Sequence, residues 1–314
     1  MQNTNMPSGI IAAIPTPFSP DGSVNIDAFV KFATFLLENG CSGLNILGTT
    51  GEATSLSLDE RLAFMTEVSL SGLPMSRLIV GTGASAATEA KKLTQHAGKL
   101  GFSGALLLPP FYYKNISNEG MLQYVSEVID GTLDNPIPIS LYNFPAMSGV
   151  TYNIELLSAL RDRHGYQIAG LKDSSNDLAY CSQAKSALRN FKIYPSNEAS
   201  LITGKSSGFA GCISATINLS SGICASALES NDESLLESAV EIREALSGLP
   251  LVAAVKLCIA LLTFDENWTR LRPPLTVLDD EQEKLLLARL EKTKFKMRPL
   301  STLSKTPRPI QNDI

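Results

Sequence analysis

The chain has 314 residues, of which 44% are hydrophobic and 18% are charged, which is enough for one large core or two smaller ones. Its net charge of −5 argues against a nucleic-acid partner. It has only two histidines, which rules out a three-histidine metal site.

Short apolar runs recur along the chain, and each ends in glycine, threonine, proline or asparagine. The runs are almost continuously apolar and do not alternate, which is typical of strands covered on both faces. We therefore predict eight strands, over residues 10–14, 43–47, 78–81, 104–108, 137–142, 168–171, 192–194 and 211–214.

Longer segments with helical periodicity lie between the predicted strands. In one of them Ser57 is followed three residues later by Glu60, the pattern of a capping box. Strand-then-helix units in this number predict a closed (β/α)8 barrel. A doubly wound open sheet is the alternative, and it is disfavoured because no GxGxxG motif follows the first strand. The predicted helices cover residues 27–39, 57–70, 88–100, 117–129, 153–160 and 177–188.

After the eighth predicted strand the sequence is helical, over residues 218–229, 233–246, 251–262 and 279–294. This exceeds the one helix that would complete a barrel. The expected fold class is therefore α/β, a TIM barrel with a C-terminal helical extension. We predict a catalytic barrel domain over residues 1–225, a helical domain over 226–297, and a polar, flexible tail over 298–314.

The sequence favours a cytoplasmic location without membrane contact. No basic region followed by an apolar run opens the chain. The longest apolar stretch, residues 251–264, contains Lys256 and is too short to span a bilayer. Cys41 and Cys258 lie in apolar surroundings, as expected for buried thiols in a reducing compartment. His96, within a predicted helix, and His164, in a predicted loop, are interpreted as solvated.

Function in such a barrel sits at the carboxyl ends of the strands, and a lysine stands out there. Lys172 ends an apolar run, so its stem would be buried at the barrel mouth. Desolvation favours a neutral amine, which attacks a ketone and forms a Schiff base. The iminium then withdraws electrons from the adjacent carbon. An ion pair with the neighbouring Asp173 is the alternative interpretation.

Two other strand ends carry polar groups. Gly48, Thr49 and Thr50 form a glycine-flanked turn whose hydroxyl and N–H groups can approach a ligand carboxylate, unless it is an ordinary connecting turn. Tyr142 ends the fifth predicted strand, where its phenol can relay a proton. A core tyrosine with a satisfied hydroxyl is the alternative.

Four motifs occur in register: GTTGE at 48–52, PFYY at 110–113, YNFP at 142–145 and GLKD at 170–173. Together they resemble the dihydrodipicolinate synthase/N-acetylneuraminate lyase family, from about residue 9 to about residue 290. The resemblance implies class I, Schiff-base aldolase chemistry on pyruvate or another 2-keto acid, with no cofactor or metal. It also implies a homo-oligomer, commonly a tetramer built from dimers.

The resemblance also implies residue roles. Lys172 corresponds to the lysine that forms the imine, and Tyr142 to the tyrosine that relays protons. Thr49 and Thr50 correspond to residues that hold the keto-acid carboxylate and support the relay. An aromatic residue donated across the dimer interface corresponds to Tyr112, or to Tyr113 if the alignment slips by one.

Further substrate contacts are expected around these residues. Ile213 corresponds to a residue that lines the pocket through its backbone. The remaining predicted contacts are Gly48, Met147, Ser196 and Glu198.

The chain departs from known members at the aldehyde half of the substrate. Synthase members carry an arginine at the position of Met147, and a thioether cannot replace a bidentate guanidinium. Sialic-acid lyases bind their polyol tail with an acidic pair and a serine. The matching positions here are Glu198, Ala199 and Ala215, so one acid remains and the serine is lost.

These departures favour an aldolase that cleaves a 2-keto-3-deoxy sugar acid, or a related 4-hydroxy-2-keto acid, to pyruvate and an aldehyde. The alternatives on the same imine are 4-hydroxy-tetrahydrodipicolinate synthase, N-acetylneuraminate lyase and a keto-acid dehydratase. An alternative of another class is a non-catalytic barrel that binds keto acids.

Overall fold

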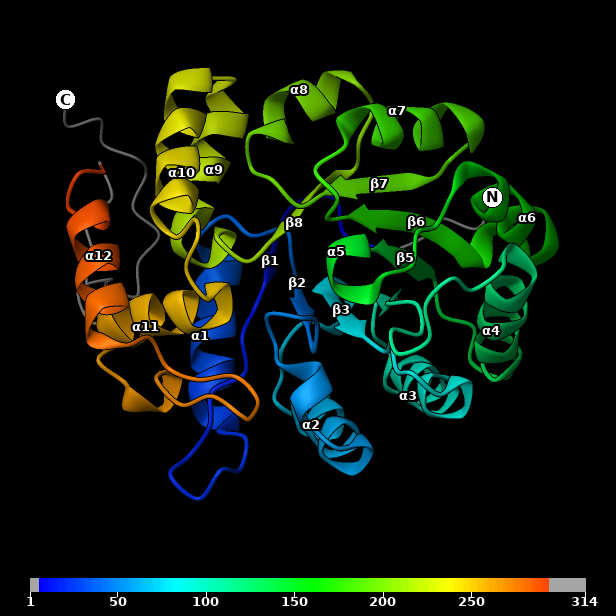
Figure 1. Cartoon of the computed structure of the whole chain (residues 1–314), viewed down its shortest axis with the longest axis horizontal. Helices are drawn as coiled ribbons and strands as arrows, with labels where there is room; N and C mark the ends of the chain where they lie inside the picture. The colour runs from blue at the N-terminus through cyan, green and yellow to red at the C-terminus, as the bar shows by residue number, and fades with distance from the viewer. Residues whose placement is uncertain (1–5, 294–314) are drawn as a thin grey trace.

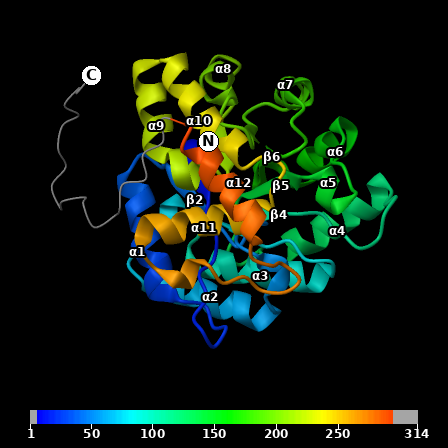
Figure 2. The same ribbon diagram turned by 60° about the vertical axis from the view of Figure 1, so that its left-hand side comes forward.

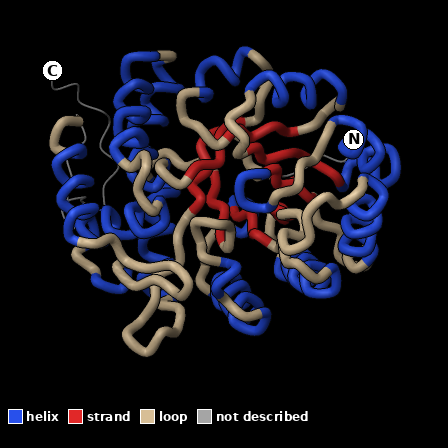
Figure 3. Tube along the Cα trace, in the orientation of Figure 1, coloured by secondary structure: helices blue, strands red, loops and turns tan. Residues whose placement is uncertain are grey.

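The computed structural model describes residues 6–293, which form a barrel of parallel strands surrounded by helices (Figures 1 and 3). The strands are hydrogen-bonded in the order β7-β6-β5-β4-β3-β2-β1-β8, so the predicted (β/α)8 class is confirmed. Their bounds are β1 Gly9–Ala13, β2 Gly43–Ile46, β3 Leu78–Gly81, β4 Gly104–Leu107, β5 Ile139–Asn143, β6 Ile168–Asp173, β7 Lys192–Pro195 and β8 Gly211–Ser214.

Both faces of the strands are buried, which explains why the strand sequences do not alternate. One set of side chains fills the barrel, and it includes Ile11, Ile79 and Ile213. The residues next to them in sequence, such as Ile10 and Val80, pack under the outer helices.

The barrel helices begin and end close to the predicted positions. Ser57 and Glu60 form the predicted capping box at the start of α2. The bounds are α1 Ile26–Glu38, α2 Leu58–Leu70, α3 Ala87–Leu100, α4 Asn118–Asp130, α6 Ile154–His164 and α7 Leu178–Ala187. Single 3₁₀ turns occur at η1 Ala53–Ser55, η2 Met75–Arg77, η3 Gly165–Gln167 and η4 Glu266–Trp268.

Several boundaries differ from the predictions for local reasons. Pro138 has no N–H to donate, and β5 begins only after it. His164 is the last residue of α6, so its assignment to a loop was wrong; basic side chains favour a helix C-terminus. The helices α5 (Pro145–Ser148) and α8 (Ser200–Ser206) were missed because they are too short for a periodic pattern.

Four more helices follow the last strand, as predicted: α9 Ile217–Ser230, α10 Glu233–Ala245, α11 Leu251–Thr263 and α12 Asp280–Leu290. They gather on one side of the barrel, where α11 and α12 come forward in Figure 2. The domain boundary predicted after residue 225 falls inside α9, and the division into domains remains a prediction. The predicted tail, 298–314, lies outside the described residues.

Residues 6–293 contain no helix with the length and apolar character needed to cross a membrane. The apolar stretch after residue 250 forms α11, which is largely buried, as expected. Cys41 and Cys258 are buried free thiols, also as expected, and the other three cysteines share that state.

Candidate active site

A cavity of about 570 Å³ opens at the carboxyl ends of the strands. Its barrel side is formed by the turn after β2, by the ends of β5, β6 and β8, and by the segment after β7. Its other side comes from α10, α11 and the segment before α12. Seven predicted site residues lie on its wall: Thr49, Thr50, Tyr142, Met147, Lys172, Ser196 and Ile213.

Lys172 lies near the end of β6 with 4% of its surface exposed. Its Cα is paired with that of Tyr142 on β5, and Nζ lies 4.2 Å from the centroid of the Tyr142 ring. Among residues 6–293, no hydrogen-bond or ion-pair partner contacts this amine. The amine therefore faces the cavity without a protein partner, where the carbonyl group of a ligand can reach it.

The alternative ion pair with Asp173 does not form. Consecutive strand residues point to opposite faces, so the Asp173 carboxylate turns away from the barrel mouth. It accepts a hydrogen bond from Asn143 Nδ2 at 2.7 Å and others from Ser175. These bonds tie the ends of β5 and β6 together, which fixes Lys172 beside Tyr142.

Tyr142 presents its ring and hydroxyl to the cavity. The ring stacks on Phe144, with 5.7 Å between the centroids, and the hydroxyl oxygen accepts a hydrogen bond from Ser174 Oγ at 3.4 Å. Ser174 also lines the cavity and was missed from the sequence. Because this bond leaves the phenol proton uncommitted, Tyr142 is placed to exchange a proton with a ligand.

The turn after β2 is shaped by close backbone approach. A Cβ at Gly81 would lie 1.9 Å from the Leu47 carbonyl oxygen, so the strand beneath the turn needs glycine there. Thr50 is buried, whereas Thr49 is exposed. Both threonines line the cavity, and their hydroxyl and N–H groups suit a carboxylate.

A buried ion pair holds this turn from behind. Glu52 Oε1 accepts a hydrogen bond from Lys256 Nζ at 2.6 Å, and Oε2 accepts one from the Arg272 N–H at 2.8 Å. Lys256 also donates to the carbonyls of Thr16 and Arg270. Burial lowers the pKa of Lys256, and the Glu52 carboxylate opposes that effect. The sequence indicated Lys256 only as an interruption of an apolar helix.

Two predicted contacts lie toward an adjoining cavity of about 190 Å³. Gly48 lines this second cavity together with Phe111. Met147 lies on α5 with 63% of its surface exposed and lines both cavities. This side of the site is therefore mainly apolar.

The aromatic pair predicted to cross an interface is strongly exposed. Tyr112 and Tyr113 are 76% and 74% exposed, and their rings contact each other edge to face. Neither residue lines the cavity of its own chain. Donation of either residue across a dimer interface remains a prediction.

The structure corrects the interpretation of Glu198. Its carboxylate is fully buried, outside the cavity wall. It accepts hydrogen bonds from Ser214 Oγ at 2.6 Å and from the Thr216 hydroxyl, and it pairs with Arg243 Nη1 at 3.2 Å. Glu198 is therefore not part of the cavity wall in this structure, and its direct contact with substrate remains a prediction. Arg243, which the sequence analysis missed, lines the cavity instead.

The cysteines and histidines do not supply an alternative chemistry at this site. Burial raises the pKa of the Cys212 thiol well above its usual range, and no cysteine lines the cavity. His96 and His164 contact the hydroxyls of Thr66 and Ser126 on the outer helices, so neither is simply solvated. Across residues 6–293, no group of three His, Cys, Asp or Glu side chains is arranged to hold a metal ion.

A barrel with an unpaired lysine beside a tyrosine at its mouth defines a class of Schiff-base lyases. Residues 6–293 match the dihydrodipicolinate synthetase family. The chain belongs to this family of pyruvate-dependent class I aldolases, and it is an enzyme of the DapA-like lyase type.

Relatives and solved structures agree over nearly the whole chain. An uncharacterized DapA-like lyase of Chloroflexus aurantiacus is 30% identical, over 91% of this chain and 97% of its own. The 4-hydroxy-tetrahydrodipicolinate synthase of Alkaliphilus oremlandii is 30% identical, over 90% of this chain and 98% of its own.

Two crystal structures superpose with a TM-score of 0.82. Dihydrodipicolinate synthase from Agrobacterium tumefaciens is 27% identical and covers 91% of this chain and 99% of its own. YagE, a prophage protein of the dihydrodipicolinic acid synthase family from Escherichia coli, is 25% identical and covers 92% of this chain and 99% of its own. It was crystallised with pyruvate.

Proposed function

We propose that this enzyme cleaves a 2-keto-3-deoxy sugar acid, or a related 4-hydroxy-2-keto acid, to pyruvate and an aldehyde. The observation that carries the proposal is the unpaired amine of Lys172 on the cavity wall, 4.2 Å from the Tyr142 ring. The pyruvate complex of YagE supports a keto acid as the ligand.

The reaction begins when Lys172 Nζ attacks the C2 ketone and water leaves, which gives an iminium ion. Thr49 and Thr50 hold the C1 carboxylate during this step. Tyr142 donates its phenol proton to the departing oxygen, and the resulting phenolate then accepts the proton of the C4 hydroxyl, directly or through a water molecule. The C3–C4 electron pair then moves into the iminium, which releases the aldehyde and leaves an enamine. Protonation at C3 and hydrolysis of the imine free pyruvate and regenerate the amine.

The same imine supports three other outcomes: condensation to 4-hydroxy-tetrahydrodipicolinate, cleavage of N-acetylneuraminate, and dehydration. The names of several relatives favour the synthase. Met147 argues against a synthase that anchors its aldehyde in the family's usual way, because α5 brings no cation to the wall. Ala215 on the wall and the burial of Glu198 argue against a sialic-acid polyol site.

A homo-oligomer, either a dimer or a tetramer, and a cytoplasmic location belong to this proposal. The exposure of Tyr112 and Tyr113 supports an interface next to the site, since large exposed aromatic side chains are typical of contact surfaces.

Borohydride reduction in the presence of pyruvate tests the proposal. We expect one reduced pyruvyl group per chain, and peptide mapping should locate it on Lys172, because borohydride converts an imine into a stable secondary amine. The same keto acid without borohydride should leave no adduct after denaturation. Absence of an adduct at saturating pyruvate would contradict the proposed function.

The variant Tyr142→Phe separates imine formation from cleavage. We expect it to trap pyruvate but to lower kcat by roughly 10²- to 10⁴-fold, the usual contribution of a positioned acid–base group. The ring that stacks on Phe144 and contacts Lys172 is retained, so the fold should be unchanged. Steady-state kinetics beside the trapping assay measure both effects. If Tyr142→Phe turned over at the wild-type rate, Tyr142 would not be the proton relay.

A further inference from the structure

The cavity wall carries a second basic side chain, supplied by the C-terminal helices. Arg243 projects from α10 and lines the same cavity as Lys172. The one other charged residue among the described residues of this wall is Glu52, and both of its oxygens are occupied by Lys256 and Arg272. Besides the reactive Lys172, the described part of this wall therefore offers one cation, Arg243, whereas its one carboxylate is already paired.

The guanidinium of Arg243 is anchored through a single nitrogen. Nη1 donates to Glu198 Oε2 at 3.2 Å, and to the hydroxyl oxygens of Ser214 and Thr216 at 3.3 Å each. Glu198 is further held by both of these hydroxyls, which makes the anchor rigid.

The other two nitrogens of the guanidinium remain available. Within residues 6–293, Nε and Nη2 have no hydrogen-bond partner, and 28% of the side chain is exposed. Nε and Nη2 form one edge of a planar guanidinium, a pair of parallel donors that matches the two oxygens of a carboxylate. A carboxylate that entered the cavity could therefore bind this edge without breaking the ion pair with Glu198.

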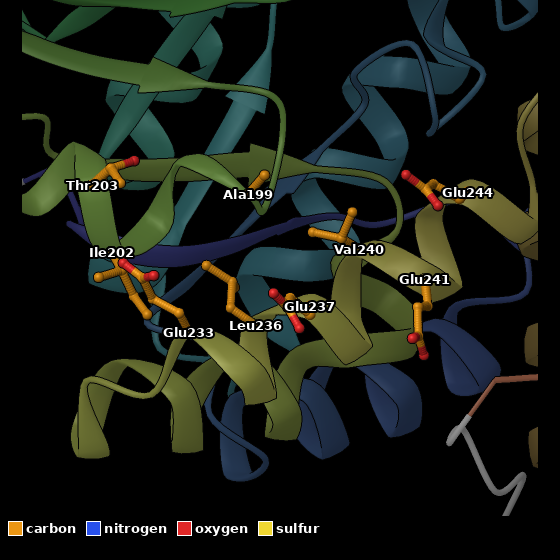
Figure 4. Close-up of a pocket in the computed structure, with 9 residues that line it drawn as sticks. All are labelled: Ala199, Ile202, Thr203, Glu233, Leu236, Glu237, Val240, Glu241 and Glu244. Carbon is orange, nitrogen blue, oxygen red and sulfur yellow. The ribbon is translucent and has the colours of Figure 1, made fainter.

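The setting of Arg243 on α10 strengthens this interpretation. Every other charged residue of the helix is a glutamate, at positions 233, 237, 241 and 244. Those four glutamates line a separate groove of about 500 Å³ between α8 and α10 (Figure 4). The one basic residue of the helix is therefore directed to the catalytic cavity, and the acidic residues to the other side.

We propose that Arg243 binds a terminal carboxylate of the substrate, so that the enzyme acts on 2-keto acids that carry a second acid group at the far end. This inference rests on the proposed function, since it places C2 on Lys172 and the near carboxylate on Thr49 and Thr50. Arg243 thereby supplies a cation for the aldehyde half, which Met147 on α5 does not provide.

Imine trapping with paired keto acids tests the assignment. The acidic probes are 2-ketoglutarate, 2-ketoadipate and 2-ketopimelate. Their partners of equal chain length, which lack the terminal carboxylate, are 2-ketopentanoate, 2-ketohexanoate and 2-ketoheptanoate. For at least one length, we expect half-maximal borohydride labelling of Lys172 at a concentration at least about tenfold lower for the acidic probe, the scale of one charge-assisted hydrogen bond.

Two variants identify the source of that preference. Arg243→Met alone would leave Glu198 buried without its ion-pair partner, so we combine it with Glu198→Gln. The double variant should lose the preference for the acidic probe. The matched control, Glu198→Gln alone, keeps the guanidinium and removes its neutralising charge, so the preference should persist or increase. A purely structural Arg243 would give the same probe ratio in both variants.

The outcomes separate the two proposals. If pyruvate labels wild-type Lys172 but no chain length favours the acidic probe, the Arg243 assignment is overturned while the imine chemistry stands. The same conclusion follows if the preference survives in the double variant. If no keto acid labels the wild-type enzyme, the proposed function itself fails.

Discussion

Replacing Lys172 with methionine will abolish the pyruvate adduct and lower kcat by about 10⁴-fold or more, because the covalent intermediate can no longer form. Methionine keeps an unbranched apolar side chain of similar length and has no amine. That amine faces the cavity and makes no hydrogen bond or ion pair with a described residue, so its loss removes no such contact from the fold. The melting temperature of Lys172→Met should therefore equal or exceed that of the wild type.

Lys192 provides the matched control. It is half-buried on β7, burial lowers its pKa, and its amine contacts the carbonyl of Met6 and the hydroxyl of Ser8, away from the cavity. Lys192→Met should keep full labelling at Lys172. If the adduct disappeared in Lys192→Met and persisted in Lys172→Met, Lys192 would be the lysine that forms the imine, and the assignment to Lys172 would be wrong. Differential scanning calorimetry and peptide mapping together measure the two effects.

Lys172 could be predicted as a functional residue from the sequence around it. An apolar run that ends in a lysine is unfavourable for stability unless the lysine has a partner, and Asp173 was the one partner that the sequence offered. In the structure Asp173 binds Asn143 and Ser175, so the partner is lost to the opposite face of the strand. Lys172 therefore keeps no acidic partner, and a local departure of this kind is typical of a functional position.

The barrel was predictable for a related reason. Its strands are buried on both faces, and an uninterrupted apolar run is a strong local signal. The short helices α5 and α8 carry no such signal, because four and seven residues do not complete enough turns to show a period. The sequence therefore identified Met147 as a departure from the family pattern but did not predict that it lies on a short helix at the cavity wall.

Residues supplied from distant parts of the chain were not predictable. Lys256 pairs with Glu52 across 204 positions, and Arg243 with Glu198 across 45. Neither spacing has a periodic signature, because both pairs depend on how the C-terminal helices dock on the barrel. The family resemblance did not find them either, since the motifs that carry it end at residue 173. The barrel side of the cavity, with Lys172 and Tyr142, was therefore predictable from the sequence, while the wall built by α10 and α11 was not.

Replacing Lys256 with methionine will destabilise the protein by about 3–5 kcal/mol, because it leaves the Glu52 carboxylate buried beside an empty place. Glu52 keeps only the Arg272 N–H, and the carbonyl groups of Thr16 and Arg270 lose a donor. Glu52 also has a left-handed backbone conformation, with φ at 55°, which its two bonded oxygens help to hold. The turn bearing Thr49 and Thr50 should loosen, so KM for the keto acid should rise as well.

A double-mutant cycle isolates this ion pair from the loss of packing. Glu52→Gln combined with Lys256→Met removes both charges, and it should recover a large part of the stability lost in Lys256→Met. The matched control is Glu266→Gln, which breaks the exposed pair between Glu266 and Arg270, whose charged atoms lie 3.9 Å apart. Exposed pairs contribute little, so this control should unfold at the wild-type denaturant concentration. If Lys256→Met unfolded at that concentration too, the buried pair would not be what holds the turn.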